Sequence, residues 1–100
     1  MQILAQGLAA SSGRIQGKAR VILAPPESNK LQPGEVLVAP MTDPSMIVDI
    51  IEKAIAIVTD HGGLASHPAI VARELGIPCI VGTKSATKVI MDGIDRKSVV

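Results

Sequence analysis

Apolar residues are grouped along this 100-residue chain in short blocks that predict alternating strands and helices. An apolar run bounded by turn formers predicts a strand buried on both faces, because neither face of such a strand contacts water and its residues do not alternate with polar ones. Three runs fit this description: Val36–Ala39, Ala56–Val58 and Cys79–Val81. Lys18–Ile22 predicts an earlier strand. Residues 25–34 are rich in turn formers and predict a loop.

Helical spacing appears between these strands. Asp43 and Pro44 predict a helix start, because aspartate caps free N–H groups and proline fits the first helical position. Apolar residues then recur at 47, 50, 51 and 54. A second helix is predicted over 67–75 and ends at Gly76, with Pro78 two residues beyond.

The C-terminal part predicts a short helix over 85–91, capped by Ser85, and a turn at 92–93 into a last strand. Early strands followed by a β-α-β-α-β order predict an α/β protein with a mixed sheet packed with helices. One hundred residues without a repeat or internal linker predict a single domain over 1–100.

Composition narrows the possible functions. The chain has no Phe, Trp or Tyr and a net charge of +1 from scattered basic residues, which argues against nucleic-acid binding. No apolar run approaches the ~18–20 residues that span a bilayer, so no membrane association is expected. A single cysteine, Cys79, predicts a cytoplasmic location and an inert thiol in a buried strand.

His67 is the candidate of greatest chemical interest. Pro68 follows it at once, which places His67 in the first turn of the predicted helix. A phosphate bonded to the imidazole there would meet unpaired N–H groups and the positive end of the helix dipole. A neutral imidazole is also a good nucleophile near neutral pH. The alternative from position alone is a capping or surface histidine.

The neighbouring residues each have a structural and a functional interpretation. Gly62 and Gly63 form a sharp turn that needs positive φ, or leave room for a phosphate to approach. Ser66 caps the helix, or its hydroxyl orients the phosphate. Arg73 lies six residues after His67, so helix geometry alone does not bring it to the phosphate, and a solvated helix face is its structural interpretation. His61 with its H-x5-H spacing to His67 does not match a zinc site, so no metal is expected.

The segment GGLASHPAIVARELGIP (62–78) closely resembles the signature of the phosphohistidine, or swivelling mobile, domain of phosphoenolpyruvate-utilising enzymes. That family includes pyruvate, phosphate dikinase, phosphoenolpyruvate synthase and enzyme I of the sugar phosphotransferase system. Three further segments are similar to it in the same order: 7–22, 31–44 and 54–60. The resemblance implies the swivelling β/β/α fold. The resemblance also implies that Arg73, which belongs to the motif, contacts phosphate or a partner domain. It further implies that Thr42 lies near the active face, although a turn residue is at least as good an interpretation.

The function that the resemblance implies is that of a phosphocarrier with a phosphohistidine at position 67. Its partners would be an ATP-grasp nucleotide domain and a phosphoenolpyruvate/pyruvate barrel, in cis or in trans, as in a pyruvate, water dikinase. The chain has no phosphate-binding G-x-x-x-x-G-K-[ST] loop and is too short for a barrel. We therefore expect no activity and no cofactor in this domain alone, with ATP and Mg²⁺ used by the partners.

Two other functions are compatible with the same resemblance. One is the carrier domain of a phosphotransferase with a drug or glucan acceptor, and the other is a swivelling module that only regulates a larger enzyme. The acceptor is not encoded in this chain. Ala65 stands where several family members have a threonine that a regulatory kinase modifies, so that regulation cannot act at this position, and the neighbouring Ser66 is a weaker alternative target. The chain also stops at DRKSVV, earlier than the family pattern, so a shortened last strand or an excised domain is expected.

Overall fold

The computed structural model describes residues 8–11, 17–84, 86–89 and 95–96. Its elements follow the chain as β1 (Leu8–Ser11), β2 (Gly17–Val21), η1 (Pro25–Lys30), β3 (Glu35–Ala39), η2 (Pro44–Met46), α1 (Ile47–Lys53), β4 (Ala54–Thr59), α2 (His67–Leu75), β5 (Cys79–Val81), α3 (Ala86–Val89) and β6 (Asp95–Arg96). The predicted α/β class is confirmed. None of the helices in this described part is long and apolar enough to cross a membrane.

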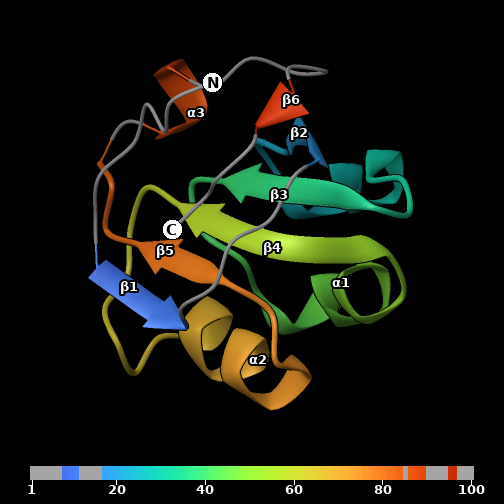
Figure 1. The fold of residues 1–100 in the computed structure, drawn as a ribbon. Coiled ribbons are helices and arrows are strands. Elements are labelled where there is room, and N and C mark those ends of the chain that lie inside the picture. Colours follow the sequence, from blue (N-terminus) through green and yellow to red (C-terminus); the bar gives the residue numbers. More distant parts are fainter. Residues whose placement is uncertain (1–7, 12–16, 85, 90–94, 97–100) are drawn as a thin grey trace.

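The strands form one sheet in the order β1-β5-β4-β3-β2-β6 (Figure 1). The four inner strands, β2 to β5, are parallel to one another. The two outer strands are antiparallel to their neighbours, β1 to β5 and β6 to β2. The sheet is therefore mixed, as expected, with a parallel centre.

Two apolar layers cover the sheet, and the strand residues contribute to them alternately. Leu37, Ile57 and Cys79 pack with residues of α1 and α2. Their chain neighbours, such as Val38 and Val58, pack in a second cluster that includes the start of α3. This alternation is the two-residue period of a strand, and it explains why the inner strands are apolar on both sides.

Several predicted bounds differ from those in the structure. The loop predicted over 25–34 contains η1, whose two N-terminal prolines suit a 3-10 helix start. The helix after Asp43 begins as the 3-10 turn η2 and ends at Lys53, so Ala54 belongs to β4 and not to the helix. The cap predicted at Asp43 is confirmed, because its carboxylate accepts the Ser45 N–H.

The predicted C-terminal helix over 85–91 is described over Ala86–Val89, and its remaining positions lie outside the described residues. Its predicted cap, Ser85, lies outside the described residues, and so does the predicted turn at 92–93. Within the described part, the Thr83 hydroxyl accepts the Ala86 N–H at the helix start. A last strand is present as β6.

Candidate phosphoryl site

The candidate site lies at the edge of the sheet where the parallel strands end. The segments that follow β3, β4 and β5 all leave the sheet at this carboxyl edge. Backbone hydrogen bonds join them: His61 N–H donates to Pro40 O at 3.0 Å, and Lys84 N–H donates to Asp60 O at 2.8 Å. Three loops that are far apart in sequence therefore form one connected surface.

His67 begins α2 at this edge, and the predicted helix bounds are confirmed at both ends. Thr42, in the loop after β3, lies against it: Thr42 Oγ1 and His67 Nδ1 are 2.8 Å apart. Thr42 is buried and His67 is half-buried. Among the described residues, a hydrogen bond is recorded for Nδ1 and none for Nε2, so Nε2 is the ring nitrogen open to a ligand.

The two glycines before His67 differ from each other. Gly62 has φ +107°, and a Cβ atom there would lie 2.8 Å from Ser66 Oγ. Gly63 is not in the positive-φ region, and a Cβ atom there would meet nothing within 4 Å. The interpretation as a turn that needs positive φ therefore holds for Gly62 alone. Gly82, after β5, also has positive φ, and a Cβ there would lie 3.1 Å from Gly62 O.

Ser66 occupies the position before the first helical residue of α2, but the predicted side-chain cap is wrong. Its hydroxyl donates to Gly63 O at 2.6 Å instead of accepting an N–H of the helix. Gly63 O also accepts the Ser66 N–H, so both the backbone N–H and the hydroxyl of Ser66 donate to this one carbonyl. The first-turn N–H groups of α2 are consequently not occupied by the Ser66 side chain.

Arg73 is not near His67 along the helix. Six residues separate them, about 9 Å of helical rise, and Arg73 lies exposed in the last turn of α2. A contact between Arg73 and a phosphate or a partner stays a prediction. His61 is exposed in the loop before α2, and the described residues contain no group of three or more side chains that could hold a metal ion.

Sequence reasoning missed the buried polar network that holds the loops together. The Asp60 carboxylate accepts the Thr87 N–H at 3.0 Å and the Thr87 hydroxyl at 2.6 Å. The Thr83 hydroxyl donates to Thr59 O at 3.0 Å, and the Thr59 hydroxyl donates to His61 O at 2.7 Å. The available signal was the TD pair that ends an apolar strand, since a buried carboxylate requires partners.

Cys79 is buried beneath the first turn of α2, where its thiol faces Pro68 O at 3.8 Å. Burial raises the pKa of this thiol to about 12, against a smaller opposing effect of the Arg73 charge. The thiol is therefore protonated at neutral pH, which agrees with the predicted inert side chain.

A family model for the mobile domain of PEP-utilising enzymes matches residues 31–99. This chain belongs to that family. It is 52% identical over 93 residues to a probable phosphoenolpyruvate synthase of Archaeoglobus fulgidus and 50% identical over 93 residues to the phosphoenolpyruvate synthase of Pyrococcus furiosus. Each alignment covers 93% of this chain, but only 12% and 11% of the respective relative.

A solved structure is similar as well. The solution structure of the enzyme I protein nEIt has a TM-score of 0.58 and 33% identity, covering 68% of this chain and 28% of that one. The fold and the matched segment that contains His67 are therefore those of the mobile domain of PEP-utilising enzymes. The chain spans about one eighth to one ninth of the length of the synthases that it matches.

Proposed function

We propose that this mobile domain carries a phosphoryl group on His67 from an ATP-binding domain to a pyruvate/phosphoenolpyruvate domain. The observation that supports it best is the 2.8 Å contact between Thr42 Oγ1 and His67 Nδ1. A proton on Nδ1 that donates to Thr42 leaves the Nε2 lone pair directed away from that contact. Histidine phosphorylation requires such a lone pair.

Each step of the proposed transfer forms one bond to phosphorus and breaks another. The Nε2 lone pair forms a bond to phosphorus while the bond from phosphorus to the donor's leaving oxygen breaks. The imidazole gains positive charge, which the Nδ1–H···Oγ1 hydrogen bond to Thr42 stabilises. In the second transfer an oxygen of the acceptor forms a bond to phosphorus while the N–P bond breaks, and Nε2 recovers its lone pair. We assign the binding of ATP and Mg²⁺ to the partner domains and a cytoplasmic location to the protein.

A labelling experiment tests the assignment of His67. Radiolabelled phosphoenolpyruvate, together with the pyruvate/phosphoenolpyruvate domain of a family member, should give an acid-labile, base-stable adduct on the wild-type chain. His67→Ala should abolish the label, and His61→Ala should retain it. Label that survives His67→Ala but is lost in His61→Ala would show that the other histidine is the carrier.

A stability control separates a chemical from a structural role. His67→Ala should cost about 1 kcal/mol or less, because a half-buried polar side chain in a first turn contributes little. Ile57→Ala, fully buried on β4, should cost roughly 2–5 kcal/mol through a core cavity. Urea unfolding measures both. Similar losses in the two variants would indicate that His67 acts as a structural residue.

A further inference from the structure

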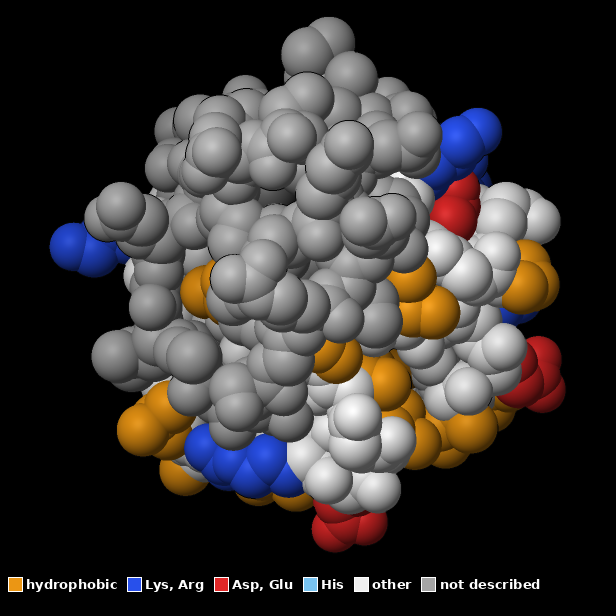
Figure 2. All heavy atoms as spheres, viewed as in Figure 1, with side chains coloured by type: hydrophobic (Ala, Val, Ile, Leu, Met, Phe, Trp, Pro, Cys, Tyr) orange, Lys and Arg blue, Asp and Glu red, His pale blue; other side chains and the backbone are white. Residues whose placement is uncertain are grey.

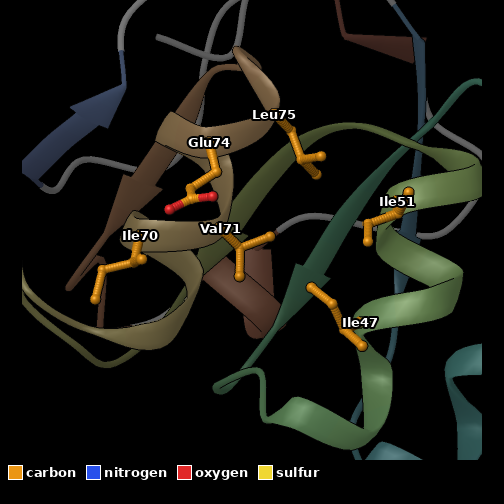
Figure 3. A pocket seen from close by; sticks show the side chains of 6 residues that line it. All are labelled: Ile47, Ile51, Ile70, Val71, Glu74 and Leu75. Carbon is orange, nitrogen blue, oxygen red and sulfur yellow. The ribbon is translucent and has the colours of Figure 1, made fainter.

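Hydrophobic side chains reach the surface of the molecule at several points (Figure 2). A groove of about 270 Å³ between α1 and α2 is lined by Ile47, Ile51, Ile70, Val71, Glu74 and Leu75 (Figure 3). This lining contains no sulfur atom and therefore no easily oxidised group. Among the seven exposed large hydrophobic residues of the described part, Met41 alone contains sulfur. Its chemistry therefore differs from that of the other exposed apolar residues.

The sulfur atoms of the described residues differ in their access to solvent. Met41 is 38% exposed, whereas Met46 is 1% exposed and Cys79 is fully buried. Burial also keeps the Cys79 thiol protonated at neutral pH, and oxidants react with the thiolate form of cysteine. Met1 and Met91 lie outside the described residues. Among the three described sulfur atoms, that of Met41 is the one open to an oxidant in solution.

Met41 lies at the candidate site. It directly precedes Thr42, whose Oγ1 is 2.8 Å from His67 Nδ1. Met41 also packs against the turn that leads to His67, because a Cβ atom built on Gly62 would lie 3.1 Å from Met41 Cε. The same Cβ would lie 2.8 Å from Ser66 Oγ, so both side chains crowd Gly62. A change in the Met41 side chain therefore acts on the loops of both Thr42 and His67.

We propose that Met41 is an oxidation site, and that its sulfoxide breaks the hydrogen bond between Thr42 and His67. The oxidant is a peroxide, such as hydrogen peroxide. The Met41 sulfur forms a bond to one peroxide oxygen while the O–O bond breaks, and the other oxygen leaves as hydroxide. The hydroxide takes the proton of the new S–OH group, which gives the sulfoxide and water. Sulfur is oxidised and the peroxide is reduced, so no further reactant is needed.

The contacts of Met41 leave little room for a larger and more polar side chain. A sulfoxide adds an oxygen atom beside the methyl group that packs on Gly62, and this oxygen needs water or a hydrogen-bond donor. Met41 must then move away from the turn, and one peptide bond joins it to Thr42. A displacement of about 0.8 Å would lengthen the 2.8 Å contact with His67 to about 3.6 Å, where a hydrogen bond no longer exists.

Peroxide treatment of the full chain tests the oxidation and its structural effect. After treatment with dilute hydrogen peroxide, peptide mass spectrometry should locate the added oxygen at Met41 and leave Met46 largely unmodified. In ¹⁵N NMR, the Nδ1 signal of His67 should move from that of a protonated nitrogen towards the average of the two neutral tautomers. Oxygen on Met46 with Met41 spared would overturn the proposal, and so would unchanged His67 signals in a chain oxidised at Met41.

Two variants assign the effect on phosphorylation to one sulfur atom. Met41→Leu removes the exposed sulfur and Met46→Leu the buried one, and each is compared with its own untreated sample. The donor is phosphoramidate, which loses ammonia as His67 Nε2 bonds to phosphorus. Oxidation should slow the wild type and Met46→Leu roughly five- to tenfold, as for the loss of one hydrogen bond. Treated Met41→Leu should keep its untreated rate, and equal losses in the two variants would contradict the proposal.

Enzymatic reduction separates the sulfoxide from irreversible damage. Methionine sulfoxide reductases for both epimers should restore the His67 signal and the rate, because they reduce methionine sulfoxide. No recovery after the Met41 sulfoxide has been removed would also overturn the proposal. The effect on rate rests on the proposed function, whereas the loss of the hydrogen bond does not. Failure of the untreated wild type to be labelled would count against the carrier function, and the NMR comparison would still decide the role of Met41.

Discussion

The contact between Thr42 and His67 joins residues 25 positions apart in the sequence. Thr42 lies in the loop after β3, and His67 begins the helix after β4, so the parallel pairing of these two strands brings them together. Because Thr42 is buried, its hydroxyl has few other directions available. This contact holds the imidazole ring with Nδ1 against Thr42. In the proposed function, Nε2 is then the reactive atom.

Removing this hydroxyl should slow phosphorylation of His67. In Thr42→Val, a near-isosteric change, we expect the rate to fall about tenfold, which corresponds to the ~1.4 kcal/mol upper value for one hydrogen bond. Thr42→Ser should keep most of the rate. Phosphohistidine formation is followed by ³¹P NMR. An unchanged rate in Thr42→Val at full stability would remove Thr42 from the mechanism.

The two glycines of the loop allow a matched comparison. Gly62→Ala should destabilise the fold by about 1–3 kcal/mol, because φ is positive and the new Cβ would collide with Ser66 Oγ. Gly63→Ala, where space is free, should stay within about 0.5 kcal/mol. Thermal unfolding of both variants measures the difference. Equal losses would contradict the distinction between the two positions.

At the scale of elements, a partly buried ion pair connects the end of β2 with the start of β3. Arg20 donates from Nε to Glu35 Oε1 at 3.2 Å and from Nη2 to Glu35 Oε2 at 3.0 Å. The Gln32 N–H adds a third hydrogen bond at 2.7 Å. Burial alone would raise the pKa of Glu35, but the hydrogen bonds from Arg20 and Gln32 outweigh it, and the pKa is lowered.

This pair should make stability depend on pH in a defined direction. A carboxyl group with a lowered folded-state pKa stabilises the fold above its unfolded value, here near 4.5, and loses that contribution as the pH falls through the folded value. Arg20→Met should therefore cost roughly 1–3 kcal/mol near pH 7 and clearly less near pH 3. Urea unfolding at both pH values measures the cost.

An exposed pair serves as the control for that measurement. Lys30 and Glu27 form an ion pair at 2.9 Å with both side chains largely in solvent. Lys30→Met should leave the urea midpoint nearly unchanged at either pH, because exposed ion pairs contribute little to stability. A pH-independent cost for Arg20→Met would mean that its packing, and not its charge, supports β2 and β3.

Elements were predictable where local chemistry decides their bounds. Pro68, Gly76 and Pro78 are local signals, and the predicted bounds of α2 match the structure. Ala54 was wrongly assigned to a helix because an alanine fits either element, and its pairing with Glu35 of β3 decides the outcome. Contacts that require the sheet to be assembled could not be predicted from the sequence.

In the site, too, residues whose roles depend on their sequence neighbours could be predicted, and residues whose roles depend on distant contacts could not. His67 and Gly62 were identified from their neighbours in sequence, and Thr42 only from a resemblance. The cap predicted for Ser66 failed because its hydroxyl has a nearer acceptor in Gly63 O, created by the turn at Gly62. The role of Asp60 was missed, because its partner Thr87 lies 27 residues away.

At the scale of the whole molecule, the proposed function requires His67 to meet two chemically different partner sites. The described residues contain no metal-binding group of side chains, and the sequence has no phosphate-binding G-x-x-x-x-G-K-[ST] loop. The chain incubated with ATP, Mg²⁺ and pyruvate should yield neither phosphoenolpyruvate nor labelled protein. Adding separate nucleotide-binding and pyruvate/phosphoenolpyruvate domains should restore both. Turnover by the chain alone would contradict the carrier function.

The hydrogen bonds that join the three loops at the carboxyl edge determine when these loops become ordered. His61, Thr83 and Lys84 are loop residues, yet each N–H donates to a carbonyl of a neighbouring loop or strand. Their amides should exchange with solvent deuterium slowly, as core amides do. This edge therefore loses its conformational entropy during folding. In the proposed function, binding of a phosphoryl donor then does not have to order these loops.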